Sequence, residues 1–383
     1  MPEVSFVLPC LNEAETLGAC IREIRECVDL HELDAEVIVA DNGSTDQSIE
    51  IALSAGATVV SVAEPGYGSA LTGGFDAALG RFLIMGDADQ SYDFRQAYPM
   101  IELMREGADM VMGSRLRGTI EPGAMPWLHR WFGNPVLSAI ARTLFRSSVS
   151  DFHCGLRGIT KRAFTEIAPH TTGMEFATEL VAKAASRGMR IEEVPVTLRP
   201  DGRSRPPHLR RWSDGWRHLR FMMTLSPRWT MLIPGLIITI VGAALMIALA
   251  IGPVTIRGVR FDIHTLMVGG LFMVVGYQMM TVAVAARMFA VIEEIGPPST
   301  PFRRAFDRFT LERGIILGLV LLAAGAILLL VVAWQWAQSG FPDLDPVITT
   351  RPVVIATTLI ALGFQTLLMS FLYNMLAIPR KRH

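Results

Sequence analysis

The sequence has little net charge and few cysteines, and each shortage excludes a class of function. Its 383 residues carry 35 basic and 36 acidic side chains, which gives a formal net charge of −1. A chain this close to neutral lacks the strong positive field that holds nucleic acid, so no nucleic-acid partner is expected. The four cysteines are scattered without a C-x-x-C pair, and we interpret them as reduced side chains of a cytosolic domain.

A secretory signal is also lacking, and charged residues become much less frequent after Arg228. Val4–Leu8 is apolar but short and has no basic residue before it, so the first half is expected to stay in the cytosol. About twenty apolar residues span a bilayer core, and four later stretches exceed twenty residues without a charge. We predict them as transmembrane helices: Thr230–Ile251, Thr265–Ala286, Gly314–Trp336 and Val353–Ile378.

Basic residues between these stretches predict the side of the membrane that each loop faces. They gather before the first stretch, between the second and third, and after the fourth. Because basic residues favour the cytosolic side, we expect both termini and the central loop to lie in the cytosol, with the protein in the inner membrane. Residues 208–228 and 301–313 mix arginines with aromatics and are predicted as helices lying in the membrane interface, with ordinary linker helices as the alternative. The expected domains are therefore 1–207, a cytosolic catalytic domain, the juxtamembrane segment 208–228, and 229–383, a transmembrane domain.

The first two hundred residues alternate short, continuous apolar runs with helix-like segments. The runs suit strands buried on both faces, and Glu13–Val28 between the first two has helical spacing with Asn12 as its expected cap. This rhythm predicts an α/β domain with a mainly parallel sheet covered by helices, in which ligands bind at the carboxyl ends of the strands. The runs are Val4–Leu8, Val37–Ala40, Thr58–Val62, Phe82–Met85 and Met110–Met112.

Acidic residues follow three of these runs. Asp87 and Asp89 come directly after Phe82–Met85, and carboxylates at that spacing can face one Mg²⁺ or Mn²⁺ ion, which prefers oxygen ligands. Glu13 follows the first run and Asp41 the second, where Asp41 can accept a hydrogen bond from a nucleobase. A capped turn is the alternative for Asp41–Asp46. Three acidic strand ends on one edge of a sheet favour a nucleotide and metal site.

These motifs resemble the GT-A fold of family-2 glycosyltransferases. The resemblance rests on Pro9-Cys10-Leu11-Asn12-Glu13, Asp41-Asn42-Gly43-Ser44-Thr45-Asp46 and Asp87-Ala88-Asp89-Gln90, in this order and spacing. Three later segments are similar to dolichyl-phosphate mannose or glucose synthases and their bacterial polyprenyl-phosphate relatives: Gly113-Ser114-Arg115, Asp151 to Arg157 and Arg199 to Arg205. The resemblance covers residues 1–228, and the helical tail is similar to that of bacterial members by topology alone.

The resemblance implies a set of site residues and a reaction. The reaction is an inverting transfer of a hexose from a nucleotide sugar, with UDP-glucose expected before GDP-mannose, to a polyprenyl phosphate. Implied nucleotide-binding residues are Pro9, Asn12, Glu13, Asp41, Asn42, Asp87 and Ala88; implied metal residues are Asp87, Asp89 and Gln90 with Mg²⁺ or Mn²⁺. Implied acceptor- and diphosphate-binding residues are Arg115, Arg130, Arg199 and Arg203, and the implied catalytic residues are Asp151, Asp89 and Arg115. The transmembrane tail is expected to anchor the protein, dock the acceptor and form contacts in a homo-oligomer.

Two questions stay open at the level of the sequence. Asp151 is either a general base or a residue that positions the acceptor or an arginine, because a phosphomonoester with a second pKa of about 6 is already an anion at neutral pH. The acceptor is either a polyprenyl phosphate or a neutral lipid such as diacylglycerol or ceramide, and a non-catalytic membrane scaffold is the remaining alternative.

The segment His208-Leu209-Arg210-Arg211-Trp212 resembles the Q-x-x-R-W signature of processive polysaccharide synthases but has histidine in place of glutamine.

Overall fold

The computed structural model describes residues 1–145, 147–204, 211–224, 226–292, 310–340 and 346–377. The chain divides into two compact units, Met1–Thr224 and Leu225–His383. Each unit is described by itself.

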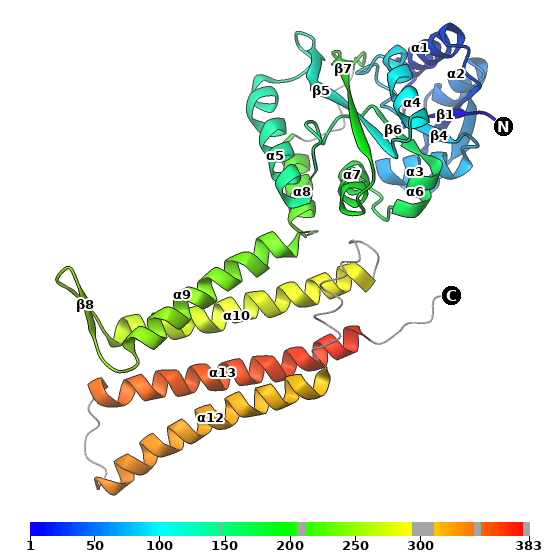
Figure 1. The fold of residues 1–383 in the computed structure, drawn as a ribbon. Helices are drawn as coiled ribbons and strands as arrows, with labels where there is room; N and C mark the ends of the chain where they lie inside the picture. Colours follow the sequence, from blue (N-terminus) through cyan, green and yellow to red (C-terminus); the bar gives the residue numbers. More distant parts are fainter. Residues whose placement is uncertain (146, 205–210, 225, 293–309, 341–345, 378–383) are drawn as a thin grey trace. The chain divides into compact units, whose positions relative to one another are not determined.

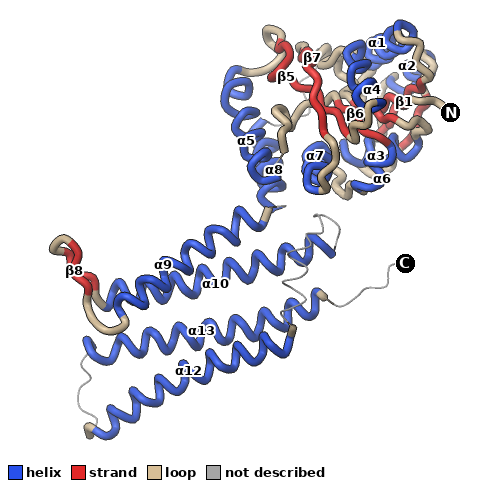
Figure 2. The backbone as a smooth tube through the Cα atoms, viewed as in Figure 1, coloured by secondary structure: helices blue, strands red, loops and turns tan. Residues whose placement is uncertain are grey.

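The first unit is built on a seven-stranded sheet (Figures 1 and 2). The strand order is β3-β2-β1-β4-β6-β5-β7, and β6 runs antiparallel to its neighbours β4 and β5 while the other pairs are parallel. The predicted mainly parallel sheet is therefore confirmed. The strands are β1 Val4–Cys10, β2 Ala35–Asp41, β3 Thr58–Ser61, β4 Phe82–Met85, β5 Met110–Ile120, β6 Arg157–Thr160 and β7 Ile191–Leu198.

Helices cover both faces of this sheet. Leu17, Ile21 and Ile24 of α1 join a core with alternate residues of β1 and β2 and with α4. On the other face Phe75 of α3 meets Phe164 of α6 edge to face, with 4.9 Å between ring centroids. The helices are α1 Leu17–Leu30, α2 Ser48–Ser54, α3 Tyr67–Ala77, α4 Tyr98–Arg105, α5 Asn134–Phe145, α6 Lys161–Ile167, α7 Phe176–Ser186 and α8 Arg211–Thr224, with a 3₁₀ turn at Phe94–Ala97 and a π-helical turn at His129–Gly133.

Two local predictions were wrong. Thr58–Ser61 is not buried on both faces, because β3 forms an edge of the sheet and its terminal residues are exposed. Asn12 is not the cap of α1, which begins after Thr16; Asn12 instead has a φ of 58° and accepts a hydrogen bond from the Thr45 N–H. The antiparallel strand β6 was not predicted, since its four residues lack a continuous apolar run.

The second unit is helical. It contains a π-helical turn at Arg228–Leu232, α9 Ile233–Leu249, α10 Ile263–Ile292, α12 Leu311–Gln338 and α13 Pro346–Leu376, with a small hairpin of β8 Val254–Ile256 and β9 Val259–Phe261. Small residues let the helix backbones approach closely. A Cβ atom added to Gly318 would lie 3.0 Å from the Gly363 carbonyl oxygen, so α12 and α13 touch at these glycines. The Tyr277 and Thr366 hydroxyls, 2.8 Å apart, join α10 to α13.

Among the described residues, four helices are long and apolar enough to cross a membrane, which confirms the prediction of four such helices. They are Arg228–Leu249, Ile263–Val291, Leu311–Gln338 and Thr349–Leu376. Part of the predicted interfacial segment 301–313, namely 301–309, lies outside the described residues, as do residues 208–210 and Ile378. Within 208–228, Arg211–Thr224 forms α8.

Candidate active site

Asp41, at the carboxyl end of β2, shapes the turn that follows it. Its carboxylate is buried and accepts hydrogen bonds from the Gly43 N–H at 3.1 Å and the Ser44 N–H at 3.2 Å. Gly43 has a φ of +92°, a conformation that favours glycine. The capped turn weighed as the alternative is thus present, and it fixes the carboxylate at the sheet edge rather than excluding a ligand there.

Two asparagines tie the first strand ends together. The Asn12 side-chain oxygen accepts the Thr45 N–H at 2.7 Å, and the Asn12 N–H donates to the Ser44 hydroxyl at 2.8 Å. Asn42 donates to the Val62 and Glu64 carbonyl oxygens at 2.9 and 2.7 Å. These contacts hold the turns after β1, β2 and β3 in one arrangement, so the polar edge of the sheet is rigid.

Arg203 connects the turn after β1 with the turn after β4. Its Nε lies 3.0 Å from Glu13 Oε2, and its Nη2 lies 3.0 Å from Asp89 Oδ2. All three side chains are largely buried, so their surroundings restrict their positions more than those of an ion pair on the protein surface. Glu13, predicted to bind the nucleoside, and Asp89, predicted to bind the metal, therefore lie within the reach of one guanidinium group.

A small cavity lies beside Arg203. Its volume is about 150 Å³, and its walls come from the turns after β1 and β2 and from the segment after β7. The lining residues are Asn12, Glu13, Ala14, Glu15, Asp46 and Arg203. The cavity thus borders the residues that the sequence predicted to hold a nucleoside.

Asp87 has a hydrogen-bonded partner that the sequence analysis missed. The Tyr67 hydroxyl, at the start of α3, donates to Asp87 Oδ1 at 3.0 Å. Burial and the charge of Asp89 raise the pKa of Asp87 to about 6, although the Tyr67 hydrogen bond and Arg203 act to lower it. Burial and the nearby Asp87 charge raise the pKa of Tyr67 above its ordinary value, so its hydroxyl stays protonated and donates.

The carboxylates after β4 suit a divalent cation. Among the described residues no group of three or more His, Cys, Asp or Glu side chains gathers as a complete ligand set. Mg²⁺ is commonly held by only one or two carboxylates together with substrate phosphates, so Asp87 and Asp89 fit a metal that arrives with a nucleotide. Asp89 Oδ2 already faces a cation in the Arg203 guanidinium, which shows that a positive charge is accepted at this oxygen.

Asp151 and Arg115 form a buried, two-point ion pair. Asp151 Oδ2 and Oδ1 each accept a hydrogen bond of 2.7 Å from the guanidinium, and Oδ2 also accepts the Arg115 N–H at 3.1 Å. Burial acts to raise the pKa of Asp151, but the charge and hydrogen bonds of Arg115 outweigh it and lower the pKa below its ordinary value. A carboxylate that is fully engaged and weakly basic suits the positioning of Arg115 better than proton transfer.

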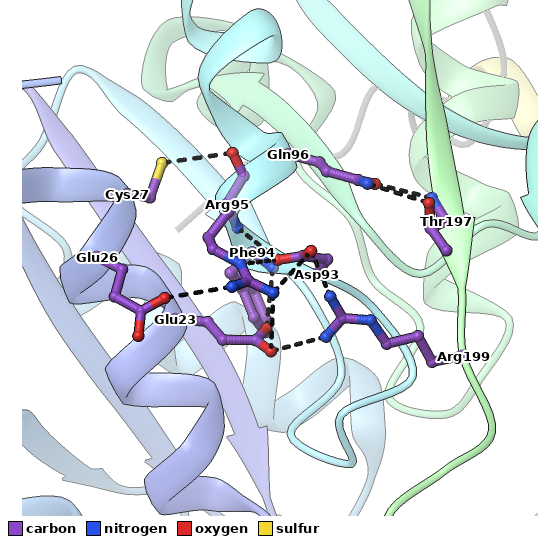
Figure 3. A network of polar contacts seen from close by, with 9 residues as sticks. All are labelled: Glu23, Glu26, Cys27, Asp93, Phe94, Arg95, Gln96, Thr197 and Arg199. Atoms are coloured by element: carbon purple, nitrogen blue, oxygen red, sulfur yellow. Dashed lines mark hydrogen bonds and ion pairs between the residues drawn. The ribbon is translucent and has the colours of Figure 1, made fainter. Parts of the chain in front are cut away.

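Arg199 lies in a different network. Figure 3 shows its guanidinium between Glu23 of α1 and Asp93, with Arg95 sharing the same carboxylates. Arg199 Nη1 lies 2.7 Å from Glu23 Oε1, and Nη2 forms an ion pair with Asp93. The structure therefore joins Arg199 to two carboxylates and not to the Glu13 and Asp89 cluster.

The remaining predicted residues lie in two regions: Pro9, Ala88 and Gln90 in or after β1 and β4, and Arg130 in the turn before α5. Pro9 lies in β1 opposite Ala40 of β2, and the Ala88 carbonyl accepts the Thr16 hydroxyl at 2.7 Å. Gln90 has a backbone φ of 63°, a left-handed conformation that is uncommon for residues other than glycine. Arg130 lies in the π-helical turn before α5, where its guanidinium carbon is 5.5 Å from the ring centre of Trp131.

Arg157 is a second residue that the sequence reasoning left without a role. It is almost fully buried and donates to the carbonyl oxygens of Cys154 at 2.6 Å, Phe152 at 3.1 Å and Ala177. The Tyr92 hydroxyl supports the same loop by accepting the Gly155 N–H at 2.8 Å. In the sequence, Tyr67 is marked by the glycines on either side of it, and Arg157 by its place at the end of the segment that begins at Asp151. Neither position predicts which atoms these two side chains contact.

Comparisons with known proteins agree with this architecture. A family model described as "Glycosyl transferase family 2" matches residues 5–168, and one described as "Glycosyltransferase family 2 C-terminal transmembrane region" matches residues 284–377. The low-salt glycan biosynthesis hexosyltransferase Agl6 of Haloferax volcanii is 36% identical over 377 residues, which cover 98% of this chain and 89% of that protein.

Two further relatives from the same organism each match about half of this chain. Glycosyltransferase AglJ is 33% identical over 202 residues, which cover 52% of this chain and 64% of that protein. A dolichyl-phosphate hexose transferase is 30% identical over 198 residues, 51% of this chain and 83% of that protein. With a mainly parallel GT-A catalytic unit followed by four helices able to span a membrane, this chain belongs to glycosyltransferase family 2.

Proposed function

We propose that this glycosyltransferase moves a hexose from a nucleotide sugar to the phosphate of a polyprenyl phosphate, with Mg²⁺ or Mn²⁺ bound at Asp87 and Asp89. The observation that carries the proposal is the Arg203 contact with both Glu13 and Asp89, because the residues proposed to hold the nucleoside and the metal then lie within reach of one side chain. The similarity to a dolichyl-phosphate hexose transferase supports a polyprenyl phosphate as acceptor class.

The donor is expected to lie along the carboxyl ends of β1, β2 and β4. Glu13 and Asp41 would bind the nucleoside, with the cavity beside Asn12 and Arg203 as its border. The diphosphate would lie toward Asp87 and Asp89, where a bound divalent cation would offset the negative charge that develops on the leaving group. UDP-glucose is the first expected donor and GDP-mannose the second.

The reaction is a single displacement at the anomeric carbon. An oxygen of the lipid phosphate forms the new bond to that carbon while the bond to the nucleoside diphosphate breaks, so the anomeric configuration inverts. The attacking phosphate is already an anion at neutral pH and needs no general base. The task of the protein is to bring two anionic groups together, which planar, two-point arginine contacts perform well.

The buried, two-point ion pair of Arg115 with Asp151 supports a role for Arg115 in this task. Its position is fixed by the two carboxylate oxygens of Asp151 and by its own backbone N–H. We assign Arg115 to the acceptor phosphate or donor diphosphate and Asp151 to the positioning of Arg115. Arg203, Arg130 and Arg199 remain proposed phosphate contacts. Each has a partner in the present structure that it would have to share or leave: Glu13 and Asp89 for Arg203, Glu23 and Asp93 for Arg199, and the Trp131 ring for Arg130.

The protein is expected in the inner membrane, with its catalytic unit and both termini in the cytosol. The four apolar helices would anchor it, help the acceptor dock and form contacts in a homo-oligomer. The basic residues that flank these helices support this topology. Because the catalytic unit is anchored to the membrane, the phosphate of a lipid acceptor can reach it while the acceptor's hydrocarbon chain stays in the bilayer.

The test is formation of the lipid product by the purified full chain. The protein in detergent is incubated with undecaprenyl phosphate, Mg²⁺ or Mn²⁺ and a panel of nucleotide sugars, and mass spectrometry detects the glycosyl-phospholipid. Asp89→Ala should abolish the product. Asp76→Ala removes an exposed carboxylate on α3 as a matched control and should retain it.

Each other outcome points to a specific alternative. Metal-dependent nucleotide binding without product would favour another acceptor, such as diacylglycerol or ceramide, which can be added to the same assay. No nucleotide binding at all would favour a non-catalytic membrane scaffold. Product that survives Asp89→Ala would contradict the assigned metal site.

A further inference from the structure

The first unit exposes a cluster of large apolar side chains around the turn that leads into α5. Trp127, Trp131 and Phe132 are 73%, 64% and 62% exposed, and Leu128 and Val136 are exposed beside them. Other exposed apolar residues of this unit, such as Leu30, Leu53 and Leu79, are far apart along the chain, as is normal for a soluble surface. We call Trp127, Leu128, Trp131, Phe132 and Val136 the aromatic patch.

Its composition is that of a membrane interface. Tryptophan is enriched where headgroups meet the acyl chains, because its ring is apolar and its N–H is polar. Arg130 lies within the patch and stacks its guanidinium on Trp131. An arginine beside exposed indoles suits a surface of anionic headgroups better than the dry contact of two protein cores, where unpaired charge is costly.

The helix that precedes the first span, α8, also exposes large apolar side chains. α5, which begins at Asn134, packs against α8 of the same unit (Figure 1), and α8 exposes Trp216 and Met223. Among the residues described in this unit, every exposed tryptophan or phenylalanine lies on the aromatic patch or on α8.

Chain length limits how far α8 can lie from the bilayer. α8 ends at Thr224, and the first membrane-spanning candidate begins at Arg228. Four Cα-to-Cα steps reach about 14 Å at full extension, and headgroup layers add several ångströms on each side of the hydrocarbon core. The covalent chain therefore keeps the end of α8 close to the membrane surface, whatever the orientation of the unit.

We propose that the aromatic patch and α8 together form a membrane-docking surface of the catalytic unit. Trp127, Trp131 and Phe132 insert among lipid headgroups, and Arg130, proposed above as a contact of the acceptor phosphate, lies with them at the level of the lipid phosphates. This surface is additional to the four spans and does not depend on which sugar or acceptor the enzyme uses.

The test places a nitroxide label on the patch of the full chain. Trp131→Cys is labelled and reconstituted in nanodiscs of phosphatidylethanolamine and phosphatidylglycerol. Leu79→Cys, which is also exposed but lies just after α3, serves as the matched control. The four native cysteines are buried, and the unmutated chain reports any background labelling. Collision of the label with oxygen, which concentrates in lipid, is compared with collision with a water-soluble nickel chelate.

The proposal expects the label at position 131 to favour oxygen and the label at position 79 to favour the nickel chelate. Equal, water-like accessibility at the two positions would overturn it. Strong dipolar broadening between labels at position 131 would show that a second copy of the chain covers the patch, and this result would also overturn it. Circular dichroism of both labelled proteins checks that each remains folded.

Discussion

Replacing Asp151 with asparagine tests the role of the buried ion pair. Asp151 is fully buried and the Arg115 side chain is 9% exposed, so Asp151→Asn leaves a guanidinium without its counter-charge inside the protein. Breaking a buried pair by removal of one partner costs about 3–5 kcal/mol. For a domain of this size, 1 kcal/mol shifts the melting temperature by about 2–4 °C, so we expect a decrease of roughly 6–20 °C.

The assay combines thermal unfolding with turnover. Asp151→Asn should reduce both the melting temperature and kcat, because Arg115 loses the contacts that fix its position. Arg115→Met with Asp151→Leu replaces the pair by apolar side chains, and such replacements restore most stability in comparable cases. The double variant should therefore melt near the unmutated protein but remain inactive.

The pH profile separates positioning from general-base catalysis. Because the pKa of Asp151 is lowered, its titration should not appear in the activity of the unmutated enzyme between about pH 5 and 8. If Asp151→Asn keeps the melting temperature and loses turnover, and the loss is relieved as pH rises, Asp151 acts as a base and our reasoning is refuted.

Three further predictions concern the metal site and the core. Tyr67→Phe removes the hydroxyl that bonds Asp87, and a lost hydrogen bond to a charged group should weaken Mn²⁺ binding with nucleotide about tenfold by calorimetry. Mn²⁺ affinity should decrease as pH falls through about 6 and level off above it, because the proton on Asp87 must leave before the ion binds; affinity that is constant between pH 5 and 8 would contradict this pKa. Glu179→Gln breaks a buried pair with Lys183, 2.6 Å away, and should lower stability by about 3–5 kcal/mol with little change in the KM for the donor, whereas an unchanged melting temperature would show that the pair is not buried in solution.

The sequence was sufficient to predict the parts of the fold and site that depend on local patterns. Continuous apolar runs marked β1, β2 and β4, and the four charge-free stretches marked helices able to span a membrane. Since the carboxyl ends of parallel strands meet at one edge, Glu13 and Asp89 could be expected near each other, and their shared contact with Arg203 agrees with that expectation.

Side-chain partners set by tertiary packing could not be predicted in this way. Arg199 follows a strand and carries the right charge for a phosphate, yet α1 presents Glu23 to it and the 3₁₀ turn presents Asp93. Tyr67 reaches Asp87 only because the start of α3 lies beside the end of β4. The edge position of β3 likewise depends on the strand order, which the apolar run does not contain.

The most direct test of the central claim follows the oxygen atoms of the acceptor. Polyprenyl phosphate with ¹⁸O in every non-bridging position is incubated with the enzyme, metal and nucleotide sugar, and the lipid product is analysed by mass spectrometry. Attack by the lipid phosphate on the anomeric carbon predicts that every heavy oxygen stays in the glycosyl-phospholipid. Loss of one heavy oxygen, or release of free sugar without a labelled lipid product, would contradict transfer to the phosphate oxygen.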